Sequence, residues 1–149
     1  MNINEAIKRG KFILEKNLIK NSQLDSEILM SQVVNKDRKF VLLNSKKELD
    51  KKKLNYFYNL IFERSKGKPI AYLTYKKNFW KYEFRVEKDI LIPRPDTEIL
   101  VEQALKITRN KSKLRVLDIG IGSGCILLSI MKEKKNFYGV GIDISQKCI

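Results

Sequence analysis

Apolar residues recur at helical spacing over the first part of the chain. Four stretches, about residues 3–20, 22–33, 37–43 and 50–66, place Ile, Leu, Val and Phe three or four residues apart. Ser22 followed by Asp25 resembles a capping box that would open the second helix. The fourth helix should end at Gly67, with Pro69 beyond it. The pattern predicts a small helical bundle in residues 1–66, with apolar stripes that form core and carry no chemistry.

Past Gly67 the apolar period changes from helical spacing to two residues. Apolar and charged side chains alternate in this segment, with Trp80, Tyr82, Phe84 and Val86 on one side. That alternation is typical of a strand with one buried face. Ile70–Thr74 is the expected hairpin partner, and residues 75–78 the expected turn. We therefore predict a β-hairpin linker over residues 67–92.

A proline-rich segment precedes the next predicted helix. Pro93 and Pro95 should hold Arg94 in an extended conformation, and Pro95 or Asp96 should open the helix. The inner face of that helix is expected to consist of Ile99, Leu100, Ala104 and Leu105. An arginine fixed between two prolines has two interpretations, a binding partner or a rigid linker with an exposed side chain.

Residues 114–143 read as strand, glycine turn, helix and strand. Leu114–Leu117 is a short apolar run, Cys125–Met131 has no helix breaker, and Phe137–Ile142 is a second strand that stops at Asp143. This order is one βαβ half-unit. The predicted fold class is therefore α/β: a helical bundle, a hairpin linker, and the incomplete start of a Rossmann-like domain over residues 93–149. Two such strands leave a sheet edge unpaired and one apolar strand face uncovered.

Glycines at 120, 122 and 124 allow the backbone to turn tightly and to approach a ligand closely. Asp143, about 20 residues further on, is expected beside the hydroxyls of a ribose. The dinucleotide pattern needs a third glycine at 125, where Cys125 stands. The spacing from Asp118 is instead D-x-G-x-G-x-G, which resembles the S-adenosyl-L-methionine (SAM) loop of methyltransferases, and the acid suits a cationic ligand. The alternative is a glycine turn that only packs a helix on a sheet.

The amino-acid composition limits the kinds of partner and site that we expect. The formal net charge is +14 over 149 residues, which would attract acidic partners including RNA, but both halves of the chain carry it. Direct nucleic-acid binding is therefore an open, less favoured alternative. Two cysteines and no histidine argue against a disulfide framework and a zinc site. With no long apolar run and no signal peptide, we expect a soluble, cytoplasmic protein without membrane contact.

Two segments carry a more specific resemblance. GKPIAYLTYKKNFW and LIPRPDTEILVEQAL, followed by VLDIGIGSGCI and GIDIS, closely resemble the PrmC/HemK family of release factor glutamine methyltransferases. The match is most specific over residues 67–105, and over the first 66 residues it is one of shape only. There the family has a helical domain that contacts the release factor. Two positions depart from the family pattern: Tyr75, where glycine is common, and Ile121, where threonine is common.

The resemblance implies an activity and a set of site residues. The activity would be SAM-dependent methylation of the side-chain amide of the glutamine in the Gly-Gly-Gln motif of peptide chain release factors. Carried over by position, the cofactor-binding residues would be Gly120, Ile121, Gly122, Ser123, Gly124 and Asp143.

The family's Asn-Pro-Pro-Tyr motif is absent from these 149 residues. In the family that motif holds the substrate amide, so no catalytic residue is assigned here. We expect the chain to be the N-terminal part of a longer enzyme and to be inactive alone. A nucleic-acid methyltransferase and a non-catalytic release-factor-binding fragment are the alternative hypotheses.

Overall fold

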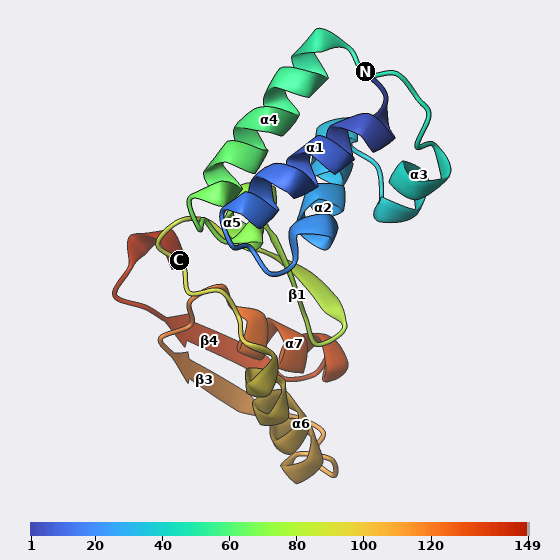
Figure 1. Cartoon of the computed structure of the whole chain (residues 1–149). Coiled ribbons are helices and arrows are strands. Elements are labelled where there is room, and N and C mark those ends of the chain that lie inside the picture. Colours follow the sequence, from blue (N-terminus) through green and yellow to red (C-terminus); the bar gives the residue numbers. More distant parts are fainter. Residues whose placement is uncertain (149) are drawn as a thin grey trace. The chain divides into compact units, whose positions relative to one another are not determined.

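The computed structural model describes residues 1–148, which form two compact units divided between Thr74 and Tyr75 (Figure 1). The first unit contains α1 (Ile3–Lys16), α2 (Ser22–Val34), α3 (Arg38–Leu43), α4 (Lys51–Ser65) and α5 (Ile70–Thr74). The second contains β1 (Lys76–Phe79), β2 (Tyr82–Arg85), η1 (Pro95–Thr97), α6 (Glu98–Ile107), β3 (Arg115–Ile119), α7 (Cys125–Glu133), β4 (Tyr138–Ile142) and η2 (Gln146–Cys148). No helix among these residues is both long enough and apolar enough to cross a membrane.

Short polar side chains fix the starts of three helices in the first unit. Asn2 accepts the Glu5 N–H at 2.9 Å while the Glu5 carboxylate accepts the Asn2 N–H, so α1 opens with a capping box. Asp37 caps α3 and Asp50 caps α4, each by accepting an N–H three residues on, at 2.8 Å. These caps explain why the helices predicted near residues 37 and 50 begin where they do.

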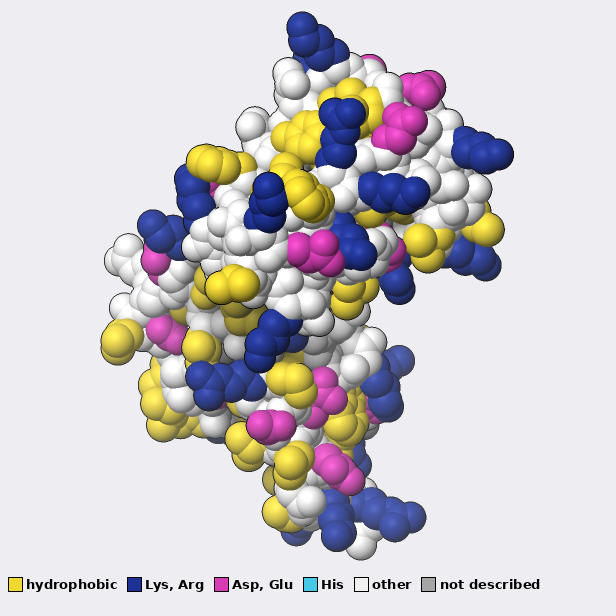
Figure 2. All heavy atoms as spheres, in the orientation of Figure 1, with side chains coloured by type: hydrophobic (Ala, Val, Ile, Leu, Met, Phe, Trp, Pro, Cys, Tyr) yellow, Lys and Arg dark blue, Asp and Glu magenta, His cyan; other side chains and the backbone are white. Residues whose placement is uncertain are grey.

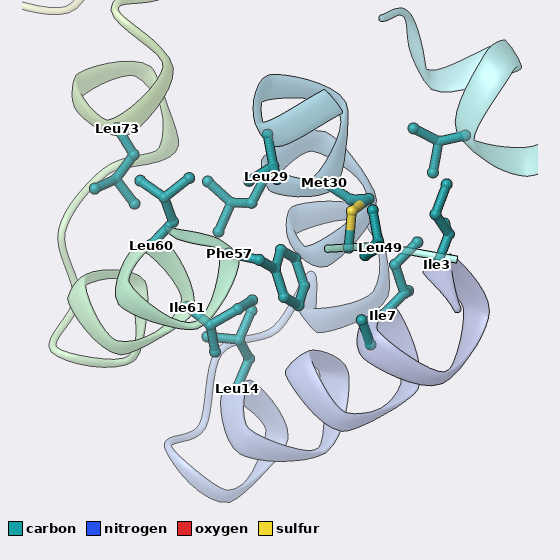
Figure 3. Close-up of a cluster of buried hydrophobic side chains, with 13 residues drawn as sticks. Ile3, Ile7, Leu14, Leu29, Met30, Leu49, Phe57, Leu60, Ile61 and Leu73 are labelled. Carbon is teal, nitrogen blue, oxygen red and sulfur yellow. The ribbon is translucent and has the colours of Figure 1, made fainter. Parts of the chain in front are cut away.

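The core of the first unit gathers around the ring of Phe57 on α4. Figure 3 shows this ring among aliphatic side chains from α1, α2, α4 and α5, and Phe57 itself is fully buried. Gly10 of α1 lies directly against α4. A Cβ atom on it would come within 2.9 Å of both Phe57 Cζ and Ile61 Cδ1. The glycine therefore allows the two helices to approach closely and does not weaken α1 as a breaker would.

The capping box predicted at Ser22 and Asp25 is wrong. Helix α2 begins at Ser22, and no side chain caps it. Asp25 instead forms an ion pair with Arg64 of α4 (Oδ2 to Nε, 2.7 Å), and the same guanidinium donates to the Lys68 carbonyl. A partner 39 residues away competes better for the buried carboxylate than the local backbone does, because a charge removed from water requires an opposite charge.

The hairpin prediction is right for one strand and wrong for the other. Ile70–Thr74 is a helix, α5, which buries Leu73 in the bundle core. Pro69 immediately precedes it, and the Pro69 carbonyl accepts the Tyr72 N–H. Strand β2 pairs instead with β1, which overlaps the segment predicted as the turn, and the true turn lies at residues 80–81. Segment 67–92, predicted as a hairpin linker, thus contains a bundle helix as well as the hairpin.

The hairpin turn is attached to both helices of the second unit. The Trp80 N–H donates to Glu98 at the start of α6, at 2.9 Å. Glu133, at the end of α7, accepts from Trp80 Nε1 at 3.0 Å, from Lys81 Nζ at 2.8 Å and from the Tyr82 hydroxyl at 3.3 Å. Glu133 therefore accepts hydrogen bonds from both turn residues and from the first residue of β2.

Helix α6 presents a different face to the core from the one predicted. Val101 is fully buried, and Ala104 and Leu105 pack beside it, whereas Ile99 and Leu100 are exposed. Helix α6 contacts α7, and residues spaced three and four apart from Val101 face that neighbour. Ile99 and Leu100 lie outside this stripe.

Strands β3 and β4 pair in parallel through the crossover helix α7, as predicted. Gly139 and Gly141 of β4 lie on the covered face. Leu127 and Met131 of α7 leave no room for a Cβ atom at Gly139, and Ile121 of the preceding loop leaves none at Gly141. The opposite face is apolar and uncovered within residues 1–148. Its side chains are 42–75% exposed: Leu117, Ile119, Tyr138, Val140 and Ile142. The expectation of one bare strand face is confirmed.

Candidate functional site

The glycine loop connects β3 to α7 and turns through left-handed backbone. Gly120, Gly122 and Gly124 have φ of +80°, +55° and +74°, values that residues with a side chain rarely adopt. A Cβ on Gly120 would meet nothing within 4 Å, and one on Gly122 would meet only the Gly120 carbonyl oxygen, at 3.9 Å, so no side chain covers this side of the loop. Gly124 differs, because a Cβ there would come within 2.9 Å of Leu128 Cδ1. Gly120 and Gly122 thus leave the backbone of the loop uncovered, and Gly124 allows the loop to pack closely against Leu128 of α7.

The loop is tied to the end of β4. The N–H groups of Gly120 and Ile121 both donate to the Ile142 carbonyl, at 2.8 and 3.0 Å. The Gly122 N–H donates to Asp143 Oδ2 at 2.9 Å. The structure therefore brings together the loop and the terminal acid that the sequence singles out 21 residues apart.

Ile121 and Ser123 are the other two predicted loop residues. The Ile121 side chain lies against Gly141 of β4, where a Cβ would clash with it. The Ser123 hydroxyl is within hydrogen-bonding reach of the Cys125 thiol, whose pKa is raised chiefly by burial. Any contribution of Ile121 to a ligand site would come from its backbone.

Two carboxylates flank the loop, and the protein shifts their pKa values in opposite directions. The pKa of Asp143 is lowered, mainly because the Ser145 and Gly122 N–H groups donate to it. The pKa of Asp118 is raised because the group is partly buried, although the Leu127 N–H opposes this effect. Asp118 Oδ2 is buried and has no hydrogen-bond partner among the described residues. An acid in this state favours a cationic ligand nearby.

Ser145 makes a contact that the sequence analysis does not point to. Its N–H donates to Asp143 Oδ1 at 2.9 Å. An aspartate two residues before an N–H is a common local turn, so the pattern Asp-Ile-Ser could have suggested it. Within residues 1–148 no group of three His, Cys, Asp or Glu side chains could hold a metal ion.

Basic side chains are scattered and do not form a single patch on the face shown in Figure 2. There, Lys and Arg alternate with Asp and Glu and with apolar side chains. Several exposed lysines lie over aromatic rings, such as Lys66 over Phe62 at 3.9 Å and Lys16 over Phe12 at 4.5 Å. These lysines cover apolar surface as well as carrying charge.

Comparison with known proteins shows what each part of the chain resembles. The family model described as the PrmC N-terminal domain matches residues 5–74, which end where the first structural unit ends. Residues 5–74 are therefore similar to the PrmC N-terminal domain. Outside the PrmC N-terminal domain, the resemblance continues through the glycine loop, since curated relatives align over the whole chain.

Those relatives are named release factor glutamine methyltransferases. One from Buchnera aphidicola is 40% identical over all 149 residues, and one from Clostridium acetobutylicum is 39% identical over the same length. The alignments cover 53% and 52% of those proteins. A bifunctional methyltransferase from Rickettsia felis is 33% identical over 99% of the chain, which covers 33% of that protein. The chain thus matches the N-terminal half of release factor glutamine methyltransferases and spans about half their length.

Proposed function

We propose that this chain is the N-terminal part of a methyltransferase that transfers a methyl group from S-adenosyl-L-methionine to the Gln side chain of the Gly-Gly-Gln motif in class 1 peptide chain release factors. The observation that carries the proposal is the joining of the bare glycine loop to Asp143, in a chain related over its whole length to enzymes of that name. The cell compartment would be the cytoplasm, where translation terminates.

The cofactor would lie against Gly120, Ile121, Gly122, Ser123, Gly124 and Asp143. The open side of Gly120 and Gly122 gives a ligand access to backbone groups. Asp143 remains ionised because its pKa is lowered, and it can accept hydrogen bonds from ribose hydroxyls. Bound S-adenosyl-L-methionine would supply the methyl group, and its positive charges suit the unpartnered oxygen of Asp118.

The first unit would bind the release factor. The relatives' name specifies release factors as what they act on, and the family resemblance implies that the helical domain contacts the release factor. The match of residues 5–74 to the PrmC N-terminal domain supports it.

Among the described residues we identify no group of hydrogen-bond acceptors that would hold the side-chain amide of the substrate glutamine. An amide nitrogen is a weak nucleophile and must be held in place while positive charge develops on it. The family's Asn-Pro-Pro-Tyr motif does not occur in residues 1–149. We therefore expect the chain to bind the cofactor weakly and to transfer no methyl group by itself.

Calorimetry tests the cofactor site. We expect weak binding of S-adenosyl-L-methionine to the wild-type chain and a loss of at least about tenfold on Asp143→Ala, since a charge-assisted hydrogen bond is removed. Glu102→Ala, which removes an exposed acid on α6, is the matched control and should leave the affinity unchanged. Tight binding that survives Asp143→Ala would contradict the proposed site.

A transfer assay tests the activity and the alternative substrate. Labelled S-adenosyl-L-methionine would be incubated with the chain and either a class 1 release factor or ribosomal RNA, the latter because the net charge of +14 favours acidic partners. We expect incorporation in neither sample with the 149-residue chain. Label on the release factor would overturn the expected inactivity, and label on the RNA would overturn the proposed substrate.

A further inference from the structure

Asp143 uses both of its carboxylate oxygens within the protein. Oδ2 accepts the N–H of Gly122 in the loop, and Oδ1 accepts the N–H of Ser145 just beyond β4, each at 2.9 Å. The carboxylate thereby joins the loop after one strand to the segment after the other.

The loop depends on this carboxylate at one point in particular. Gly120 and Ile121 donate to a backbone carbonyl, that of Ile142, which no side-chain substitution removes. Gly122 has φ of +55° and donates to a side chain. Because an unpartnered N–H is costly, removing the carboxylate should free the middle of the loop while its first part stays attached.

We propose that Asp143 is a positioning residue that holds the glycine loop in its binding-competent shape before a ligand arrives. This role goes beyond a contact with ribose. Each carboxylate oxygen can accept more than one hydrogen bond, so the bonds to Gly122 and Ser145 leave acceptor capacity for hydroxyl groups. The loop and the ligand can then share the carboxylate. The holding role is internal to the chain, and only its benefit to binding rests on the proposed function.

Hydrogen exchange of backbone amides in the 149-residue chain, without added ligand, tests the inference. We expect the Gly122 amide to exchange about tenfold to a hundredfold faster in Asp143→Ala, as loss of a charge-assisted hydrogen bond implies. The amides of Gly120 and Ile121 are internal references and should change little. Asp89→Ala is the matched control, because Asp89 is an exposed acid of the same unit that pairs with Lys147 and not with the loop. Equal exchange of Gly122 in Asp143→Ala and wild type would overturn the proposal.

A measurement on the wild-type chain guards against a variant that fails to fold. Scalar coupling across the hydrogen bond, between the Gly122 amide nitrogen and the Asp143 side-chain carboxyl carbon, should be detectable without substitution. Its absence in a well-resolved spectrum would overturn the proposal. These results do not depend on the cofactor. If calorimetry finds no S-adenosyl-L-methionine binding while Gly122 remains protected by Asp143, the proposed function fails and the positioning role stands.

Discussion

The two units differ in how completely they bury their apolar side chains. The first unit surrounds Phe57 with side chains from several helices and pairs its buried acids with arginines. The second unit covers one face of a two-stranded parallel sheet and leaves the other in solvent. A helical bundle can close its core over a short chain, whereas a parallel sheet needs cover on both faces. The unit with the complete core is the one matched by the family model, and the unit with the bare face carries the candidate site.

The largest expected effect contrasts a core residue with a residue of the bare face. Phe57→Ala should lower the free energy of unfolding by about 3–5 kcal/mol, since it leaves a large cavity. Ile119→Ala, on a strand but 75% exposed, should change it by less than about 0.5 kcal/mol. Urea denaturation followed by circular dichroism measures both. Similar losses for the two variants would mean that the sheet face is not bare in solution.

The next effect concerns the buried ion pair of the bundle. Arg64→Ala leaves the Asp25 carboxylate buried without its partner and should cost about 3 kcal/mol. Lys53→Ala removes a pair with Asp50 at the surface and should cost less than about 1 kcal/mol. The same denaturation curves provide the comparison. An Arg64→Ala cost no greater than that of Lys53→Ala would show that water reaches Asp25.

A smaller effect, of opposite sign, is expected at the start of the second unit. Tyr75 has φ of +59°, a left-handed value that favours the glycine common at this position in the resembled family. Its side chain is half exposed, so Tyr75→Gly should stabilise the protein by about 1 kcal/mol. Tyr56→Gly, in the interior of α4, should destabilise it by about 1 kcal/mol. The melting temperature should therefore rise in Tyr75→Gly and fall in Tyr56→Gly. A fall in both variants would show that the backbone at Tyr75 is not strained.

The smallest effect is a pH dependence that originates at Glu133. Hydrogen bonds from Lys81 and Trp80 lower the pKa of this carboxyl below its ordinary value of 4.5. The stabilisation is therefore complete above about pH 4.5 and is lost as the pH falls through the lower folded-state value. Glu133→Gln should reduce the difference between melting temperatures at pH 6 and pH 3, followed by Trp80 fluorescence. Glu102→Gln should leave this difference unchanged, and an unchanged difference in Glu133→Gln would contradict the assignment.

The sequence predicted the elements whose signals are local. The glycine turn, the crossover helix and the two parallel strands of residues 114–143 follow from periodicity and glycine spacing, and the structure has them all. Helix α5 was missed because Ile70–Thr74 is too short to show a helical period and contains residues that favour strands. Its helical form depends on Pro69 and on burial of Leu73.

The sequence pattern does not predict contacts between residues that are distant in the chain. Asp25 looked like a local cap, but its partner is Arg64. The sequence identifies the glycine loop and Asp143 as the expected site. That Asp143 accepts a hydrogen bond from Gly122 becomes visible only with the pairing register of β3 and β4. Local rules identify which residues have chemistry, and tertiary packing decides which of them meet.

Amide chemical-shift mapping tests the central claim most directly. The isotope-labelled 149-residue chain would be titrated with S-adenosyl-L-methionine and its spectrum followed residue by residue. We predict concentration-dependent shifts confined to residues 118–124 and 142–145, which surround the glycine loop. Shifts confined to residues 1–74, or none at millimolar ligand with the second unit folded, would contradict the assignment of this loop as the cofactor site.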